Sequence, residues 1–168
     1  MNKENECENN YGSSSDNYST YFKKVGDLKK GQYVCINNRP CKIIDYSSMK
    51  NGKHGHCKST ILAVDIFTKK KVEYSQPASN TIDVPEVVRG EYILISLNED
   101  GICELKKLKT NEIRKDIKVY KDSSDEIEFF KLLFKLFNEV KNSGKEEIIA
   151  TVFSAMNINR IVEFRKSA

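Results

Sequence analysis

Short apolar runs separated by turn-forming residues constrain the fold of this chain more than any other feature. In the first half, each run is too short for a typical helix, and turns rich in Asn, Pro or Lys stand between the runs. Short strands at such close spacing favour a small β-barrel over a helical domain. The expected strands cover residues 33–36, 41–46, 61–66, 71–74 and 80–83.

The second half continues this pattern and adds one helix. Ser123 and Glu126 have the spacing of a capping box, which marks the start of a helix, and Gly144 is a typical residue at a helix end. Five strands with one helix in this order fit an OB-fold. The apolar face of the helix is predicted to contain Ile127, Phe130, Phe134 and Phe137. The expected strands cover residues 91–97, 102–105, 113–119, 147–153 and 161–164.

Charge is distributed unevenly along the chain. Residues 1–19 carry one basic and four acidic side chains, residues 20–84 carry twelve and five, and residues 85–168 carry fifteen of each. The first segment is polar and poor in aliphatic residues, so we expect a disordered tail at 1–19. The proline in Val84-Pro85-Glu86 predicts a boundary between domains at 20–84 and 85–168. The positive middle segment favours a polyanionic partner such as a phosphate backbone, with a merely solvated surface as the alternative.

Composition argues against several classes of protein. No apolar run approaches the roughly 20 residues of a membrane span, and the first residues lack the apolar core of a signal peptide. The five cysteines are odd in number and have no framework spacing, which predicts reduced thiols in a cytoplasmic protein. Cys35, Cys41 and Cys103 lie in strand-like runs and are expected to be small core residues.

The stretch from residue 48 to residue 58 has the most unusual composition. It holds three lysines and two histidines and no carboxylate. Gly52 and Gly55 bracket Lys53-His54, and glycine reaches positive φ without steric cost, so the chain can turn sharply there and point Lys53 outward. Asn51-Gly52 is also a two-residue hairpin signal, which would put Lys53 on a strand instead. Periodicity does not choose between these two registers.

Several separate motifs resemble the translation initiation factor 5A family. Gly52-Lys53-His54-Gly55-His56, with Lys50 before it and Lys58 after it, is similar to the hypusination loop of that family. The resemblance covers roughly residues 20 to 168, and its motifs occur in the right order. Further similar segments are residues 38–44, 64–68, 82–85 and 154–156.

The resemblance implies a fold and a function. It implies a mainly β protein, with an N-terminal SH3-like barrel at 20–84 that carries the hypusine loop, followed by an OB-fold barrel at 85–168. It also implies a cytoplasmic translation factor that is not an enzyme. Such a factor binds the large ribosomal subunit beside the peptidyl-tRNA and promotes peptide-bond formation at stalled sites such as polyproline. It also assists termination.

The family's modified lysine corresponds to Lys53. Deoxyhypusine synthase would add an aminobutyl group from spermidine, and deoxyhypusine hydroxylase would then hydroxylate it, with no bound cofactor and no metal in the factor itself. Asn51 and Cys57 depart from the family's usual threonine and alanine, and neither removes a charge. The residues expected to present Lys53 and to contact RNA are Lys50, Gly52, His54, Gly55, His56 and Lys58.

Two other functions are considered. A generic RNA-binding module would use the basic barrel and the OB face without any lysine modification. A metal-dependent enzyme would use His54, His56 and Cys57, but the stretch holds no second ligand cluster and no carboxylate for acid–base work.

Overall fold

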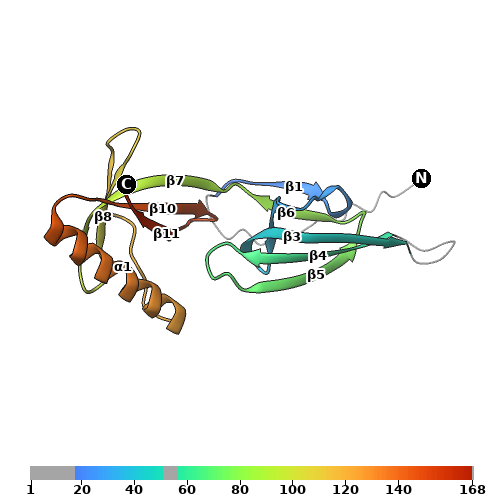
Figure 1. Cartoon of the computed structure of the whole chain (residues 1–168). Coiled ribbons are helices and arrows are strands. Elements are labelled where there is room, and N and C mark those ends of the chain that lie inside the picture. Colours follow the sequence, from blue (N-terminus) through green and yellow to red (C-terminus); the bar gives the residue numbers. More distant parts are fainter. Residues whose placement is uncertain (1–17, 51–56, 168) are drawn as a thin grey trace.

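The computed structural model describes residues 18–50 and 57–167. The described residues form eleven strands, one α-helix and one short 3-10 helix, arranged in two β-rich halves (Figure 1). The elements are β1 (Thr20–Lys24), η1 (Val25–Asp27), β2 (Tyr33–Ile36), β3 (Arg39–Lys50), β4 (Cys57–Asp65), β5 (Lys71–Pro77), β6 (Thr81–Pro85), β7 (Val88–Leu97), β8 (Cys103–Lys107), β9 (Ile113–Arg114), α1 (Ser124–Ser143), β10 (Ile148–Ala155) and β11 (Ile158–Lys166).

The N-terminal half contains an antiparallel sheet in the order β2-β3-β4-β5 and a two-stranded sheet of β1 and β6. Alternate residues of β2 and β4 are buried, because successive side chains of a strand point to opposite faces. The turn between β2 and β3 consists of Asn37 and Asn38 alone, both at positive φ, as the tightest hairpins require. The expected strands ended at residue 36 and resumed at residue 41, but Arg39 and Pro40 already belong to β3. The core residues are Val25, Leu28, Val34, Ile36, Cys41, Ile43, Ile61, Ala63 and Ile82.

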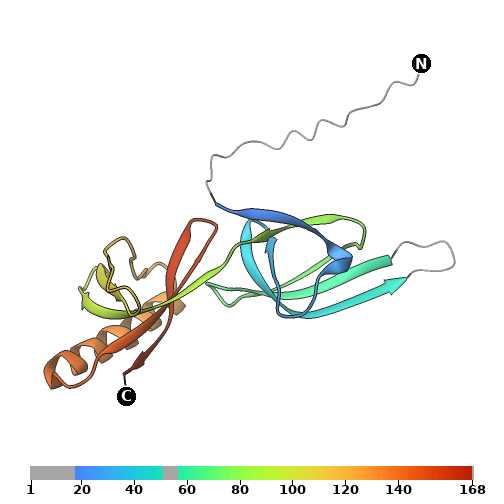
Figure 2. The ribbon, with the colours of Figure 1, turned by 90° about the horizontal axis from the view of Figure 1, so that it is seen from above.

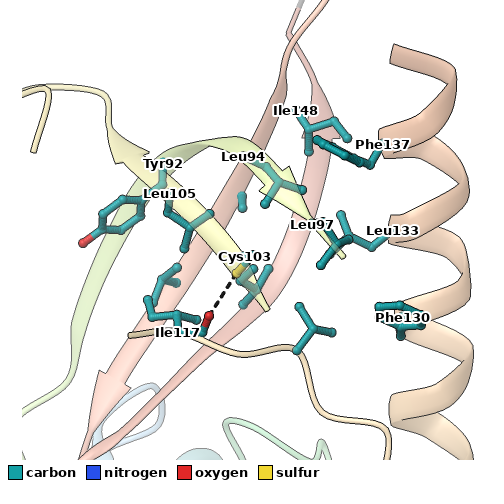
Figure 3. Close-up of a cluster of buried hydrophobic side chains, with 14 of the residues drawn as sticks. Tyr92, Leu94, Leu97, Cys103, Leu105, Ile117, Phe130, Leu133, Phe137 and Ile148 are labelled. Atoms are coloured by element: carbon teal, nitrogen blue, oxygen red, sulfur yellow. Dashed lines mark hydrogen bonds between the residues drawn. The ribbon is translucent and has the colours of Figure 1, made fainter. Parts of the chain in front are cut away.

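The C-terminal half is an antiparallel sheet in the order β11-β10-β7-β8-β9, with α1 packed against it. Figure 3 shows Phe130, Leu133 and Phe137 of α1 pointing toward the sheet, where Leu97 and Ile148 lie. The Cys103 thiol donates to the carbonyl oxygen of Ile117 at 3.0 Å, which satisfies this buried group. The whole core of this half is separate from that of the N-terminal half.

The ends of α1 confirm the predicted caps. The Ser123 hydroxyl accepts a hydrogen bond from the Glu126 N–H, and the Glu126 carboxylate accepts one from the Ser123 N–H, both at 3.2 Å. Gly144 ends the helix with φ +65°. The predicted face was wrong at Ile127, which is 38% exposed, whereas Phe134 is partly buried and packs against the core. The buried residues of the helix are Phe130, Leu133, Phe137 and Val140.

The expected strand at residues 113–119 is also mostly wrong. Only Ile113 and Arg114 pair with β8, and beyond them a single bridge joins Lys118 to Ile102. Ile117 and Val119 are buried as the alternation predicted, but the Val119 N–H donates to the carbonyl oxygen of Gly101 rather than to a neighbouring strand. The turn at Gly101 therefore provides the backbone acceptor that a neighbouring strand would otherwise provide.

The N-terminal boundary differs from expectation in one respect. β1 was not predicted, because its consecutive exposed residues, among them Tyr21 and Phe22, lack the alternation of a half-buried strand. The predicted tail falls outside the described residues up to residue 17. Its last residue, Ser19, accepts a hydrogen bond from the Glu86 N–H at 3.1 Å. The domain limits between residues 84 and 85 stay a prediction.

Candidate functional site

The candidate site lies at the outer end of the hairpin formed by β3 and β4. These antiparallel strands pair from Cys41 and Asp65 to Lys50 and Cys57. The side chains of residues 47–50, 57 and 58 are exposed. The hairpin therefore extends beyond its core and points away from the C-terminal half (Figures 1 and 2).

Polar contacts fix the base of this hairpin. The Tyr46 hydroxyl lies 2.8 Å from the hydroxyl of Ser59, which is fully buried, and it also contacts the carbonyl oxygen of Gly26 at 3.4 Å. A buried hydroxyl without a partner costs free energy, so this pair favours one arrangement of the base. The strands carry mostly polar residues here, and periodicity alone did not single out Tyr46 or Ser59.

The two strands of the hairpin are supported unequally. β5 follows β4 as far as the pairing of Lys58 with Pro77, and the Ala78 N–H then donates to the carbonyl oxygen of Cys57 at 2.8 Å. On its other side, β3 pairs with β2 only as far as Lys42, and the last backbone bonds join Ile43 to Gly31 and Gln32. Among the described residues, the outer part of β3 thus has β4 as its one strand neighbour.

Lys50 and Lys58 lie at the end of the hairpin on opposite faces. Lys50 is paired with Cys57. Lys58 is paired with Met49, the residue that precedes Lys50 on β3. Residues directly opposite in an antiparallel pair share a face, and consecutive residues alternate. The two predicted loop lysines are therefore exposed on opposite faces at the end of the hairpin.

The other predicted site residues fall outside the described residues. They are Gly52, Lys53, His54, Gly55 and His56, in the stretch that connects Lys50 to Cys57. The choice between the two turn registers and the assignment of Lys53 therefore stay predictions.

An ion pair fixes the opposite end of the same two strands. Arg39 donates to both carboxylate oxygens of Asp65, at 2.8 and 3.3 Å, and the N–H groups of Phe67 and Thr68 donate to it at 2.9 and 3.0 Å. Burial raises the pKa of Asp65, but these donors outweigh burial and hold that pKa below its ordinary value. Four hydrogen bonds on one buried carboxylate fix the register of β3 against β4 and the turn that follows.

Replacing Asp65 by asparagine is expected to destabilise the protein by about 1–3 kcal/mol at pH 7, because a charged acceptor for Arg39 is lost. Since the folded protein holds the pKa of Asp65 below its unfolded value, this contribution is present above about pH 4 and is lost as the pH falls through the folded pKa. Thermal unfolding between pH 7 and pH 2.5 should show a shallower acid destabilisation for Asp65→Asn than for the parent. Glu73→Gln, an exposed carboxylate-to-amide change on β5, is the control, and an equal effect from it would contradict the assignment.

Two of the described thiols, those of Cys41 and Cys103, are unreactive by position. Burial raises the pKa of Cys41 and of Cys103 to about 11 in each case, with Asp65 and Asp116 adding to the shift. Both are buried, as predicted, whereas Cys35 is only half-buried, and the four described cysteines are free. None of these four forms a disulfide with another, and the prediction of reduced thiols stays a prediction.

Residues 18–50 and 57–167 contain neither a candidate metal cluster nor a candidate membrane span. No group of three or more His, Cys, Asp or Glu side chains in these ranges is placed to bind a metal ion. His54 and His56 lie outside them. No helix in the same ranges is long and apolar enough to cross a membrane.

Comparison with known proteins identifies the family. A family model described as "Translation initiation factor 5A-like, N-terminal" matches residues 18–80. The eukaryotic translation initiation factor 5A-3 of Arabidopsis thaliana is 37% identical over 139 residues, which is 82% of this chain and 80% of that protein. The eukaryotic translation initiation factor 5A of Trypanosoma brucei brucei is 38% identical over 149 residues, which is 89% of this chain and 88% of that protein. The chain belongs to the translation initiation factor 5A family.

Structures of the translation initiation factor 5A family share the fold described above. The family protein from Naegleria fowleri aligns with a TM-score of 0.73 and 36% sequence identity, covering 87% of this chain and 98% of that chain. The predicted fold class, a mainly β protein with an SH3-like barrel followed by an OB-fold with one helix, is confirmed. The prediction of a role in translation is confirmed at the level of the family.

Proposed function

We propose that the protein is a cytoplasmic, non-enzymatic translation factor that acts through a hypusine at Lys53. It binds the large ribosomal subunit next to the peptidyl-tRNA and promotes peptide-bond formation at stalled sites such as polyproline, and it assists termination. Deoxyhypusine synthase and deoxyhypusine hydroxylase build the side chain from Lys53 and spermidine. The SH3-like domain at 20–84 carries the modified loop, and the OB-fold domain covers 85–168.

One observation supports this proposal most directly. The β3–β4 hairpin extends beyond its core, and the stretch 51–56 that joins its two ends carries Lys53. The polar base around Tyr46 and Ser59 supports the hairpin at its root. A lysine carried on such an element can enter both an enzyme pocket and a narrow site on RNA.

The chemistry of the modified side chain fits the proposed role. Hypusine lengthens the lysine and adds an amine, so a second positive charge and further hydrogen-bond donors reach a phosphate-rich site. Lys50 and Lys58 add exposed positive charge on both sides of the loop. Steadying the acceptor end of the tRNA would accelerate reaction by orientation rather than by proton transfer. Gly52, His54, Gly55 and His56 would present Lys53 to the synthase.

The proposal is tested by translating two reporters in a purified system, one with a run of prolines and one without. The protein is made with and without the two modifying enzymes, and its intact mass is measured before each assay. We expect the modified protein to restore synthesis through the proline run, the unmodified protein to restore much less, and neither to change the control reporter.

Equal rescue by the modified and unmodified proteins would contradict the hypusine mechanism and favour the generic RNA-binding module. An unmodified mass after treatment with both enzymes would contradict the assignment of Lys53. Metal analysis of the purified protein tests the third possibility, in which His54, His56 and Cys57 bind a metal.

A further inference from the structure

Two cations lie near the ring of Tyr120, in the segment between β9 and α1. The guanidinium carbon of Arg160 is 3.4 Å from the centroid of the Tyr120 ring, and the Lys118 ammonium is 5.9 Å from it. The first distance is that of direct stacking, and both are within the range of cation–π attraction. Tyr120 is nevertheless 36% exposed, so part of this residue can be reached from the solvent.

The β-sheet extends this arrangement across two more strands. Arg160 on β11 is directly opposite Phe153 on β10, and Phe153 is directly opposite Arg89 on β7. Directly opposite residues share one face of a sheet, with Cβ atoms about 5 Å apart. Cationic and aromatic side chains therefore alternate along one line. We call this set the stacking row: Arg89, Phe153, Arg160, Tyr120 and Lys118.

The positive charge of the stacking row is poorly compensated within the described residues. Arg89 lies 3.6 Å from Glu91, whereas neither Arg160 nor Lys118 forms a salt bridge with a described carboxylate. The Nη1 group of Arg160 is buried and has no hydrogen-bond acceptor there. A buried charged donor without an acceptor costs free energy, so an incoming anion that reached it would be favoured.

The sequence around Tyr120 adds to this field. Residues 104–121 carry seven basic and three acidic side chains, although residues 85–168 as a whole carry fifteen of each. Positive charge in the C-terminal half is therefore concentrated in the segment that contains Lys118 and Tyr120. The balanced total of this half hides a local positive potential.

We propose that the stacking row binds single-stranded RNA, with an unpaired base on Tyr120 and phosphates at Lys118, Arg160 and Arg89. This combination of aromatic rings and unpaired cations is the one that non-specific single-strand sites use. An acidic peptide would use the cations but not the open tyrosine ring, and in duplex RNA the bases are stacked on one another. The inference rests on the proposed function in that RNA is the partner of a translation factor, and it adds a second contact far from the β3–β4 tip (Figures 1 and 2).

The test uses the full-length, unmodified protein and a fluorescein-labelled oligouridine of about twelve nucleotides, with binding measured by fluorescence anisotropy. Tyr120→Leu keeps an apolar side chain but loses the ring, and it is expected to weaken binding about tenfold. Arg160→Lys keeps the charge but loses the planar group, and it is expected to weaken binding at unchanged salt dependence. Lys118→Ala should lower the slope of log affinity against log salt by about 0.7.

Matched controls separate the row from general effects. Tyr21→Leu makes the same change at an exposed tyrosine in the other half, and Lys145→Ala removes an exposed charge beyond α1; both should bind like the parent. Any of four results would overturn the proposal: equal weakening by Lys145→Ala, equal affinity for an RNA duplex, displacement by polyglutamate at the same charge concentration, or no measurable binding.

Thermal unfolding of Tyr120→Leu verifies its fold, and Arg160→Lys gives an independent answer. Because neither ribosomes nor hypusine are present, failure here is distinguishable from failure of the polyproline assay.

Discussion

Replacing Lys53 by arginine is expected to remove nearly all activity on a polyproline reporter while leaving the fold intact. Arginine keeps one positive charge on a long stem, so the bulk electrostatics of the loop survive. The guanidinium stays protonated at any working pH, and it therefore cannot act as the amine nucleophile that accepts the aminobutyl group. If the extended, modified side chain performs the function, the loss should approach that of omitting the factor.

Lys50→Arg is the matched control for this prediction. Lys50 is an exposed lysine at the end of β3, paired with Cys57, and it is not the proposed acceptor. It should retain most of the activity when both variants are offered the modifying enzymes and assayed with the same reporter. Full rescue by Lys53→Arg would refute the hypusine assignment and favour a module that uses charge alone.

Replacing Gly101 by alanine is expected to destabilise the protein by about 3–5 kcal/mol, because two separate costs add. Gly101 has φ +83°, which side-chain-bearing residues rarely adopt, and a Cβ there would overlap the carbonyl oxygen of Val119. The obstacle is backbone, and the same segment is held by the bond from the Val119 N–H to the Gly101 carbonyl oxygen. For a chain of this size, the melting temperature should fall by roughly 10 °C.

Gly144→Ala separates steric overlap from backbone strain. Gly144 also has positive φ, at +65°, but a Cβ there would meet no atom within 4 Å. Only the conformational cost of about 1 kcal/mol is expected at this position. Chemical denaturation of both variants measures the difference, and a Gly101→Ala variant no less stable than Gly144→Ala would show that the turn can shift away from Val119.

The sequence predicted local features of the fold better than long-range ones. The caps of α1 depend on side chains within three residues of each other, and both were predicted correctly. The buried face was partly wrong because apolar residues stand on several sides of this helix, and the aromatic residues were preferred over Leu133 and Val140. Which stripe packs is decided by the sheet beneath, and helical periodicity does not contain that information.

The prediction of a strand at residues 113–119 was mostly wrong for a related reason. Its alternation correctly indicated that Ile117 and Val119 are buried, but a strand also needs a partner along its edge. Here the turn at Gly101 provides the hydrogen bond that a neighbouring strand would have provided. The burial of Ile117 and Val119 could be predicted from the sequence. The hydrogen-bond partner of Val119 could not, because it is Gly101, which lies 18 positions away.

The candidate site was predicted through motifs rather than through periodicity. The resemblance marked residues 50–58, and the structure adds the part that motifs do not contain: the Tyr46–Ser59 contact at the base and the bond between Ala78 and Cys57. These contacts join segments that are 13 and 21 residues apart, so no short window of sequence contains both partners.

Because of its unequal support, the outer part of the β3–β4 hairpin projects freely and, among the described residues, is held by a neighbouring strand only on the β4 side. Movement toward β5 would compress the paired ladder that runs to Pro77, whereas along the outer part of β3 no described strand resists sideways movement on the β2 side. A two-stranded hairpin supported in this way resists compression along its strands and bends more easily toward the β2 side. A side chain carried at its end can be pressed lengthwise into a deep site without buckling, and it can also swing sideways to meet binding partners of different shape.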